Sequence, residues 1–410
     1  MALLVQKYGG SSLAEAPRIR SVARRVAETR RSGDDVVVVA SAMGSTTDEL
    51  VRLSQAVSPN RHSREMDMLL TAGERIAMAL LAMAIQDQGV EAMSLTGSQA
   101  GILTDRSHGR AKIREVRGER VREGLEAGKV VIVAGFQGVA PDTKEVTTLG
   151  RGGSDATAVA LAAVLGADVC EMYTDVDGVF SADPRIVSEA RMLKEVSFDE
   201  MLELSAAGTR VVMLRAVEFG RRFNVPLHVR SSFHDGAGTW IKEKTMEDAI
   251  VTGIAHDTSE AKVTVHGVPD VPGIAARLFT PIAEEGVNVD MIVQNVSTMG
   301  HTDISFTVLR EHAAEARRLA ERVAGEIDAG GVDVDENIAK VSLVGAGMKT
   351  HPGIAARMFD TLAAQDINIQ MISTSPIRVS CVIGSDRVEE AVRSLHDAFQ
   401  PPTRLEEGSG

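Results

Sequence analysis

Two glycine-rich loops in the N-terminal half carry side chains that could bind an anion. Lys7-Tyr8-Gly9-Gly10-Ser11-Ser12 stands where an expected strand ends and a helix begins, and Gly150-Arg151-Gly152-Gly153-Ser154-Asp155 opens a second helix. Glycines let the backbone approach a ligand, and the free amides of a helix start favour negative charge. Lys7 adds a point charge, and Arg151 adds a planar fork suited to a carboxylate or phosphate. A plain turn in the first loop and a simple helix cap at Asp155 are the structural alternatives.

Three further places carry polar side chains that could take part in binding or catalysis. Tyr173-Thr174-Asp175-Val176-Asp177-Gly178-Val179-Phe180 leads into Ser181-Ala182-Asp183-Pro184-Arg185, where acids, a hydroxyl and a turn could hold a nucleotide or the hydration shell of Mg²⁺. A turn rich in Asx residues is the alternative. The hydroxyls of Ser41-Ala42-Met43-Gly44-Ser45-Thr46-Thr47-Asp48 either contact a polar substrate or cap a helix. Glu74, inside a long helical pattern, is functional only if it faces a pocket, and otherwise belongs to a solvated face.

A parallel sheet is expected to position these loops. Short β-branched runs alternate with apolar stretches of helical period, which predicts strands covered by helices on both faces. Sheets of this kind bind ligands at the carboxyl ends of their strands. Strands are expected at 2–7, 35–40, 91–95, 130–134, 168–173 and 226–230, with helices at Leu13–Arg31, Glu65–Asp87, Asp155–Leu165 and Phe198–Ala206.

The C-terminal part contains an internal repeat. Residues 272–292 and 352–372 are identical at 11 of 21 positions, beginning with Pro-Gly-Ile-Ala-Ala-Arg in each copy. A shared pattern of this length indicates duplication. Each copy is expected to form most of a ferredoxin-like βαββαβ unit. Its elements are a strand (262–268; 340–345), a helix (272–286; 352–366), two strands (288–294 and 303–309; 368–373 and 377–383) and a helix (311–325; 386–398).

Length, charge and composition exclude several classes of protein. The 410 residues suffice for two or three domains, and the net charge of −13 with few aromatic residues argues against a nucleic-acid partner. The apolar runs are shorter than the roughly 20 residues of a membrane-spanning helix, so no membrane partner is expected. Only Cys170 and Cys381 occur, which excludes a disulfide framework and a cysteine-based zinc site and favours the reducing cytoplasm.

Several common catalytic signatures are absent from the chain. No P-loop, no His-Arg-Asp catalytic loop, no dinucleotide fingerprint and no recognisable nucleophilic triad occurs. The histidines at 256, 266, 301 and 351 lack metal-ligand spacing. We therefore expect no metal held directly by protein side chains.

Taken in order, the loops at 7–12, 41–48, 150–155 and 173–179 closely resemble those of the aspartate kinases, and the repeat resembles paired ACT domains. The resemblance implies an amino-acid-kinase fold of the α/β class, a mainly parallel sheet covered by helices, followed by two α+β ferredoxin-like ACT domains. It places the kinase domain at 1–232, a linker at 233–250, the ACT domains at 251–335 and 336–400, and a flexible tail at 401–410.

The activity implied by the resemblance is transfer of a phosphoryl group from ATP, with Mg²⁺, to the side-chain carboxylate of L-aspartate. Such an enzyme is a phosphotransferase with a carboxyl acceptor, and its product 4-phospho-L-aspartate opens the synthesis of lysine, threonine and methionine. A carboxylate is already deprotonated at pH 7, so the reaction needs no general base, and the barrier comes largely from bringing anions together.

The resemblance also implies residue roles. Lys7 and Asp155 are the catalytic pair. ATP is contacted by Lys7, Tyr8, Gly9, Gly10, Ser41, Ser154, Thr174, Asp175, Phe180, Ser181, Ala182, Asp183, Pro184, Arg185 and Arg210. Aspartate is contacted by Ser45, Thr46, Thr47, Asp48, Glu74, Arg151, Gly152, Gly153 and Ser154, with Arg151 and Ser154 on a carboxylate and Glu74 on the α-ammonium.

Regulation and assembly follow from the same resemblance. Threonine and lysine together are the expected feedback inhibitors, with effector contacts from Asp270, Gly273, Ile274, Ala275, Asn288, Gln294, Asn368 and Ile369. A Pro-Gly helix start offers amides to an amino acid's carboxylate. The subgroup that this chain resembles makes a shorter subunit from an internal start, here near Met246, which implies a homo-oligomer or an α₂β₂ assembly.

The chain departs from the family pattern in two places. Gly208-Thr209-Arg210-Val211-Val212-Met213-Leu214 replaces Gly-Ala-Lys-Val-Leu-His-Pro, so Arg210 stands where a lysine contacts the nucleotide, and an altered ATP affinity is expected. Ser375-Pro376-Ile377 replaces Ser-Glu-Ile, and Pro376 removes an amide and a charge.

Two other functions are compatible with parts of this pattern. One is a related amino-acid kinase that acts on a different carboxylate, against which the paired ACT repeat argues. The other is a non-catalytic amino-acid sensor, against which the retention of Lys7, Asp155 and the Arg151-to-Ser154 loop argues.

Overall fold

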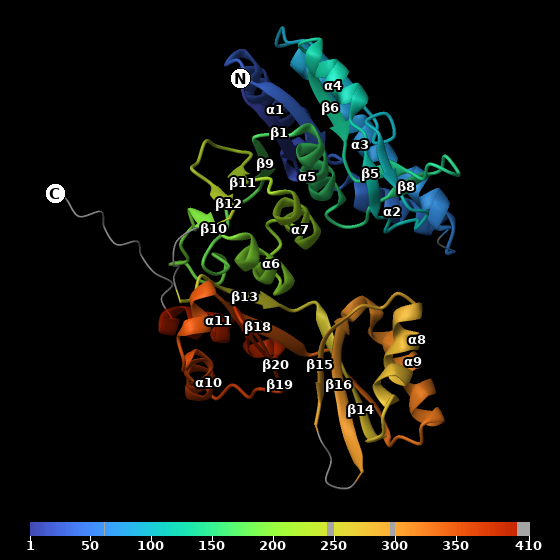
Figure 1. The fold of residues 1–410 in the computed structure, drawn as a ribbon, viewed down its shortest axis with the longest axis vertical. Coiled ribbons are helices and arrows are strands. Elements are labelled where there is room, and N and C mark those ends of the chain that lie inside the picture. The colour runs from blue at the N-terminus through green and yellow to red at the C-terminus, as the bar shows by residue number, and fades with distance from the viewer. Residues whose placement is uncertain (61, 244–249, 296–299, 400–410) are drawn as a thin grey trace, which may run out of the picture. The chain divides into compact units, whose positions relative to one another are not determined.

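The computed structural model describes residues 1–60, 62–243, 250–295 and 300–399, which form two compact units (Figure 1). The first unit comprises Met1–Phe180, Met192–Ala206 and residues 210–243. The second comprises Ser181–Arg191, Ala207–Thr209 and the C-terminal part from residue 250 onward. Met246 and the tail predicted at 401–410 lie outside the described residues, so both predictions stand as they were made.

An eight-stranded sheet forms the centre of the first unit, in the order β10-β12-β11-β9-β1-β2-β6-β3. The neighbours β1 and β2, β1 and β9, β9 and β11, β2 and β6, and β3 and β6 are all parallel. Its strands are β1 (Leu3–Tyr8), β2 (Asp35–Ala40), β3 (Ala92–Leu95), β6 (Val130–Ala134), β9 (Val169–Thr174), β10 (Glu195–Val196), β11 (Leu227–Ser231) and β12 (Thr239–Ile241). The six strands predicted from the sequence are confirmed, because buried Val-rich runs fit strands covered on both faces.

The helices of the first unit follow the strands as expected from the alternating pattern. They are α1 (Ala16–Arg31), α2 (Thr46–Val57), α3 (Ser63–Gln86), α4 (Glu119–Glu126), α5 (Gly153–Leu165), α6 (Phe198–Ala206) and α7 (Leu214–Phe223), with a 3₁₀ turn η1 at Gly10–Leu13. The four helices predicted from the sequence are present as α1, α3, α5 and α6.

Helix α3 is, among the described residues, the one helix whose length and composition would allow it to cross a membrane. The sequence analysis expected no apolar run of that length. In the folded unit, however, Ala77, Leu81 and Ile85 are fully buried in the core with strand residues of the sheet. The same helix buries the carboxylates Asp67 and Glu74. Helix α3 is therefore a core helix of the first unit.

A second, smaller sheet was not predicted. It has the order β5-β4-β7-β8 and consists of β4 (Ile102–Thr104), β5 (Ile113–Val116), β7 (Gln137–Val139) and β8 (Val146–Thr148). Strands of three or four residues are too short to show an alternating pattern, which explains why the sequence did not reveal them.

The range 233–250, predicted as a linker, contains strand β12. This strand pairs antiparallel with β11 and parallel with β10. The buried Thr239 Oγ1 accepts a hydrogen bond from Val179 N at 2.9 Å. This part of the predicted linker therefore belongs to the large sheet.

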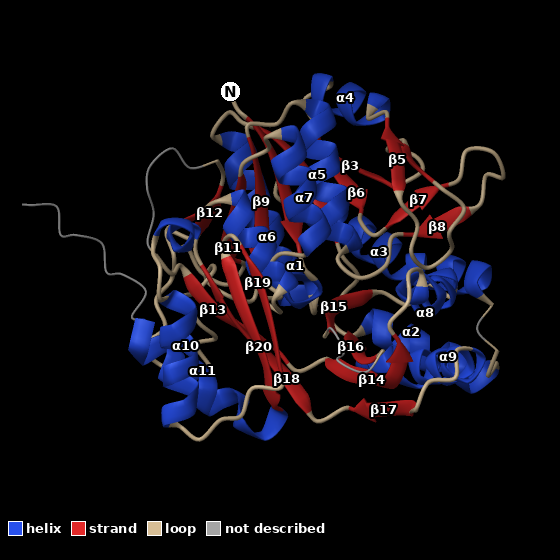
Figure 2. Cartoon of the chain, turned by 60° about the horizontal axis from the view of Figure 1, so that its bottom comes forward, coloured by secondary structure: helices blue, strands red, loops and turns tan. Residues whose placement is uncertain are grey.

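The second unit contains two four-stranded antiparallel sheets, each with two helices. The first sheet has the order β15-β16-β14-β17, and the second has the order β13-β18-β20-β19. Figure 2 shows α10 and α11 together beside the second sheet. The elements are β13 (Gly253–Asp257), β14 (Glu260–Pro269), α8 (Ile274–Glu284), β15 (Val289–Gln294), β16 (His301–Leu309), α9 (Ala313–Glu326), β17 (Gly331–Asp335), β18 (Ile338–Val344), α10 (Ile354–Ala364), β19 (Met371–Ser375), β20 (Arg378–Gly384) and α11 (Val388–Phe399), with 3₁₀ turns η2 (Arg310–His312), η3 (Ala346–Thr350) and η4 (Ser385–Arg387).

The two repeats obtain their fourth strand in different ways. In the first sheet, β17 follows α9 and pairs with β14. In the second sheet, the equivalent place beside β18 is taken by β13, which precedes the entire first repeat in the chain. The duplicated units are thus interleaved, and β13 lies within the range predicted for the first ACT domain although it completes the sheet of the second.

A buried ion cluster joins the two sheets. Lys340 on β18 is 1% exposed, and its Nζ lies 2.6 Å from Glu260 Oε1 on β14 and also contacts Asp290 on β15. Next to it, the buried Met291 and Met371 pack in one apolar cluster. Because a buried lysine requires charged partners, this cluster fixes which strands of the two repeats face each other.

Pro376 lies in the tight turn between β19 and β20, where Ser375 pairs with Arg378. Residues inside such a turn do not donate to the strand ladder, so the missing amide of Pro376 leaves the sheet intact. The departure from the family pattern at this position is therefore compatible with the observed strand pairing.

We expect the stability of the chain to depend on pH through His266 on β14. Its Nδ1 lies 3.1 Å from Asp303 Oδ2, and its Nε2 lies 2.9 Å from Asp333 Oδ2, on the two flanking strands. The hydrogen bonds to Asp303 and then Asp333 raise the pKa of His266. Because the pKa is higher in the folded state, His266 stabilises the protein fully below the unfolded pKa of about 6.5. This stabilisation is lost as the pH rises through the folded-state pKa.

The test is urea unfolding of wild type and His266→Gln, followed by far-UV circular dichroism at pH 5.5 and pH 8. Wild type should exceed the variant in the free energy of unfolding by more at pH 5.5 than at pH 8. A difference that is equal at both values would contradict the prediction. Because the site is exposed, we expect a small effect.

Candidate functional site

Lys7 and Asp155 form a close ion pair at the carboxyl edge of the large sheet. Lys7 lies near the end of β1, where it is level with Val39 on β2 and Met172 on β9. Its Nζ lies 2.7 Å from Asp155 Oδ1, in the first turn of α5, and the two side chains are 15% and 10% exposed. Two of the predicted loops therefore meet through their charged side chains, as expected for loops at the same edge of a parallel sheet.

The loops after β1 and β2 touch through their backbones. Gly44 N donates to Gly10 O at 2.9 Å, and Ser41 N donates to Tyr8 O at 3.2 Å. A Cβ atom on Gly10 would lie 3.0 Å from Ala42 O and 3.1 Å from Gly44 O. Gly10 is therefore needed for close approach of the two loops, which is more than a plain turn requires.

Glu74 faces the interior, which excludes the solvated-face interpretation. The preceding Gly73 lets α3 approach the loop after β2, since a Cβ there would lie 2.8 Å from Ala42 Cβ. The Glu74 side chain is buried, and its Oε2 has no hydrogen-bond partner among the described residues. Burial raises the pKa of Glu74 to about 7, against the opposing effect of hydrogen bonds from backbone amides, including that of Ala42. A buried carboxylate with a free oxygen is suited to pair with a cation.

The loop before α5 depends on two glycines with left-handed backbone. Gly150 and Gly152 have φ of 75° and 71°, and a Cβ on Gly152 would lie 2.2 Å from Met213 Cγ. The helix is capped by Gly152 without a side-chain hydrogen bond. Asp155 instead pairs with Lys7 and accepts a hydrogen bond from Met213 N at 3.3 Å. The simple cap interpretation of Asp155 is therefore wrong, and Arg151 in the same loop is exposed.

The hydroxyls predicted to contact aspartate lie at the start of α2. Ser45 occupies the N-cap position of this helix without a side-chain capping hydrogen bond, and its Oγ donates instead to Glu49 Oε1 at 2.6 Å. Thr46 and Thr47 are half-buried, and Asp48 is exposed. Capping therefore does not account for the Ser45 hydroxyl. A Cβ on Gly73 of α3 would lie 3.5 Å from Thr46 Cγ2, so Thr46 lies close to the residue that precedes Glu74.

Several residues of the first unit that were predicted to contact the nucleotide lie around the end of β9. Gly9 N donates to Tyr173 O at 3.3 Å, and Thr174 Oγ1 donates to Asp175 Oδ1 at 3.1 Å. The Tyr8 ring is fully buried and stacks on Tyr173 with centroids 4.7 Å apart. The side chain of Tyr8 is therefore not available to a ligand. Phe180 is half-buried, and Arg210 is exposed.

The remaining residues predicted to contact the nucleotide belong to the second unit. Ser181 and Ala182 are 1% and 3% exposed, so their side chains are enclosed by protein. Asp183 and Arg185 form an ion pair at 2.7 Å, and Pro184 is exposed. The sequence analysis grouped these five residues with the Tyr173–Phe180 loop, whereas the fold assigns the two segments to different units.

The predicted effector residues gather at helix starts and strand ends of the second unit. Gly273 has φ of 89° and caps α8. Ile274 is buried and Ile369 is half-buried. The exposed members of the set are Asp270, Gly273, Ala275, Asn288, Gln294 and Asn368.

The sequence did not reveal two residues next to the predicted site, Asp67 and His108. The fully buried Asp67 on α3 accepts hydrogen bonds from Gly109 N at 3.0 Å and Thr148 Oγ1 at 2.5 Å, and it contacts His108 Nδ1 at 2.7 Å. Gly109 in turn packs against the Arg151 loop, since a Cβ on Gly150 would lie 3.1 Å from Gly109 O. By binding Gly109, Asp67 therefore helps to position this loop. The signal that could have identified Asp67 is an acid set among Met66, Met68, Leu69 and Leu70 of an apolar helix.

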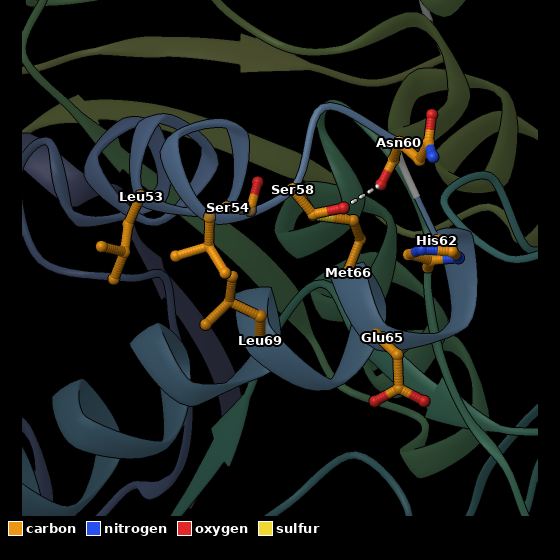
Figure 3. A pocket seen from close by; sticks show the side chains of 9 residues that line it. Leu53, Ser54, Ser58, Asn60, His62, Glu65, Met66 and Leu69 are labelled. Carbon is orange, nitrogen blue, oxygen red and sulfur yellow. Dashed lines mark hydrogen bonds between the residues drawn. The ribbon is translucent and has the colours of Figure 1, made fainter.

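A pocket of about 290 Å³ lies between the end of α2 and the start of α3 (Figure 3). Leu53, Val57, Met66 and Leu69 give it an apolar wall, and Ser58 Oγ donates to Asn60 O at 3.1 Å beside it. None of the described residues that line it is a predicted site residue. The pocket is therefore separate from the candidate site.

The chain is similar to known kinases along its whole length. Residues 2–231 match the amino acid kinase family, and residues 263–323 and 341–399 match the ACT domain. It is 58% identical over 405 residues to an aspartokinase of Mycolicibacterium smegmatis, which covers 97% of this chain and 96% of the relative. It is 55% identical over 406 residues to an aspartokinase of Corynebacterium glutamicum, which covers 98% of this chain and 96% of that relative.

A solved structure supports the same fold. The crystal structure of E. coli aspartokinase III in complex with aspartate and ADP matches with a TM-score of 0.84 at 24% identity, covering 97% of this chain and 100% of that chain. The predicted fold class, an amino-acid-kinase fold followed by two ACT domains, is confirmed.

Proposed function

The chain belongs to the aspartokinase family, and on that premise we propose that it transfers the γ-phosphoryl group of ATP to the side-chain carboxylate of L-aspartate. The products are 4-phospho-L-aspartate and ADP. The observation that carries the proposal is the Lys7–Asp155 pair, 2.7 Å apart where the loops after β1 and before α5 meet. A fixed ammonium at the edge of a sheet is suited to a phosphoryl group that gains charge on transfer.

The proposed substrate contacts come from the loops around Lys7 and Asp155, and the geometry of Glu74 supports them. Glu74, buried and with one free oxygen, pairs with the α-ammonium of aspartate. Arg151 and Ser154 bind a carboxylate at the start of α5, where amides favour anions. Ser45, Thr46, Thr47, Asp48, Gly152 and Gly153 complete the aspartate side.

The nucleotide contacts lie along the neighbouring loops. The backbones of Gly9 and Gly10 allow close approach of phosphate oxygens, and Asp155 holds Lys7 in place. The remaining proposed contacts are Tyr8 through its backbone, Ser41, Ser154, Thr174, Asp175, Phe180, Ser181, Ala182, Asp183, Pro184, Arg185 and Arg210.

The proposed reaction is a direct displacement. A side-chain carboxylate oxygen of aspartate bonds to the γ-phosphorus as the bond between this phosphorus and the bridging oxygen of ADP breaks. The nucleophile is ionised at pH 7, so no residue has to remove a proton. Lys7 and the helix-start amides offset the charge that develops on the phosphoryl oxygens.

Magnesium fits this site as part of the nucleotide complex. Within the described residues, no group of three or more His, Cys, Asp or Glu side chains could hold a metal ion. Asp155 is already paired with Lys7. Bound to the nucleotide phosphates, Mg²⁺ would neutralise part of their charge.

We also propose that threonine and lysine together inhibit the enzyme through the ACT domains. Gly273 and Gly353 begin α8 and α10 without a side-chain capping hydrogen bond, which supports carboxylate binding by helix-start amides there. The proposed setting is the cytoplasmic synthesis of lysine, threonine and methionine, with a homo-oligomer or an α₂β₂ assembly containing a shorter subunit that starts near Met246.

Trapping of the acyl phosphate with hydroxylamine tests the proposal. Wild type should form hydroxamate with ATP and L-aspartate but not with L-glutamate or N-acetylglutamate, and added threonine plus lysine should lower the rate. Preference for glutamate or N-acetylglutamate would replace the proposal with a related kinase activity. Calorimetric binding of threonine without binding of ATP would indicate an amino-acid sensor instead.

A further inference from the structure

Residues Ser181–Arg191, here called the 181–191 segment, follow the nucleotide-side loop directly but belong to the second unit. The chain leaves the first unit at Phe180 and re-enters it at Met192, and these two residues form a β-bridge. Next to them, Ser181 N donates to Arg191 O at 2.8 Å. The two ends of the segment are therefore held together by backbone hydrogen bonds. Between them lie the proposed nucleotide contacts Asp183, Pro184 and Arg185.

The segment is built into the core of the second ACT domain. Ala182 and Val187 are each 3% exposed and lie in one apolar cluster with Val392 and Leu395 of α11. Ile186 packs against the same cluster, and its carbonyl oxygen accepts a hydrogen bond from Arg393 Nε at 3.0 Å. Contacts with α11, about 200 residues later in the sequence, thus fix the backbone position of the segment.

A buried polar pair fixes the first residue of the segment. Ser181 Oγ lies 3.2 Å from His396 Nε2, and the two residues are 1% and 7% exposed. Ser181 Oγ already accepts a hydrogen bond from Arg191 N at 2.9 Å, so its hydroxyl proton can be donated to His396. Burial lowers the pKa of His396, which favours the neutral ring that accepts this proton.

We propose that His396 is a positioning residue for the nucleotide: it holds Ser181, and through Ser181 it sets the place of Asp183, Pro184 and Arg185. The inference rests on the proposed ATP-dependent function. Apolar packing alone would tolerate small shifts of the segment, whereas a buried hydrogen-bonded pair specifies one position. The second ACT domain would then contribute to ATP affinity directly, with no effector bound.

The test compares His396→Ala, Ser181→Ala and the double variant by steady-state kinetics with hydroxamate detection. We expect His396→Ala to raise KM for ATP about tenfold and Ser181→Ala to raise it at least as much, because Ser181→Ala also removes the bond from Arg191 N. Each change should leave KM for aspartate within about twofold, and the double variant should show no rise beyond that of Ser181→Ala, because that change already removes the interaction with His396. His396→Gln, whose amide oxygen can accept from Ser181, should restore most of the ATP affinity.

Met358→Ala is the matched control, because it removes a buried apolar side chain of α10 from the same core. It should lower thermal stability without the selective rise in KM for ATP. Calorimetric binding of a non-hydrolysable ATP analogue to the folded variants gives a readout that does not require turnover.

Two results would overturn the role of His396. One is unchanged ATP affinity in a folded His396→Ala protein, and the other is an equal rise of both KM values. If wild type binds the ATP analogue but lacks aspartate-dependent turnover, the proposed function fails while the analogue measurements still decide the role of His396.

Discussion

Replacing Lys7 by alanine is expected to lower kcat for aspartate-dependent turnover by about 1000-fold, or ~4 kcal/mol of transition-state stabilisation. Lys7 is the charged group fixed at the edge of the sheet, and a developing charge in a largely dehydrated site depends strongly on such a group. Lys7→Arg should recover only part of the rate, because the planar fork cannot reproduce a point charge held 2.7 Å from Asp155.

The Lys7 prediction needs a control for folding, because the substitution also leaves Asp155 buried without its cation. The double variant Lys7→Met with Asp155→Asn removes both charges, so it should regain stability but not activity. The single tryptophan, Trp240, stacks on His228 in the first unit with ring centroids 4.0 Å apart, so its fluorescence can follow unfolding of that unit. An active double variant would show that the pair is structural.

Replacing Glu74 by glutamine is expected to raise KM for aspartate by about 10- to 100-fold while KM for ATP stays the same. The reason is the loss of a charged hydrogen bond to the α-ammonium, worth about 1.5–3 kcal/mol. The pKa of about 7 adds a pH dependence. Since the ionised carboxylate binds the ammonium, kcat/KM for aspartate should fall as the pH drops below about 7 in wild type, and this inflection should be absent from the variant.

Stability measurements separate this binding role of Glu74 from a structural one. A carboxyl whose folded-state pKa is raised from 4.5 to about 7 destabilises the fold increasingly as the pH rises from about 4.5, and fully above about pH 7, where the charge is buried. At pH 8 and without substrate, Glu74→Gln should therefore be at least as stable as wild type in thermal unfolding. A variant that is less stable and has both KM values raised would contradict the assignment.

The parallel sheet and the repeat were predictable because their signals are local and periodic. The Val-rich runs at β2 and β6 match buried strands, and the duplicated Pro-Gly helix starts recur at α8 and α10. The sheet and the repeat needed only residue type and spacing. The pairing of Lys7 with Asp155 was instead implied by the resemblance of their loops to those of the aspartate kinases, and it agrees with two loops at strand ends sharing one edge of the sheet.

The features that were not predicted depend on contacts between distant parts of the chain. The burial of Glu74 depends on Gly73, which brings α3 against Ala42, and neither residue signals this by itself. The 181–191 segment reads as a polar turn, yet Ala182 and Val187 fill the core of an ACT domain formed about 200 residues later. Tertiary packing determined these positions, so local propensity could not reveal them.

The interleaved strand β13 has a consequence for synthesis of the chain. On the ribosome, β13 emerges before the whole of the first repeat, but its partner β18 emerges only after it. The first repeat can close its own sheet early, whereas β13 must wait unpaired until β18, β20 and α11 have been made. Non-local pairing of this kind slows folding. The second ACT domain should therefore be the last part of the protein to fold during translation, and its open edge is where a nascent chain would most need a chaperone.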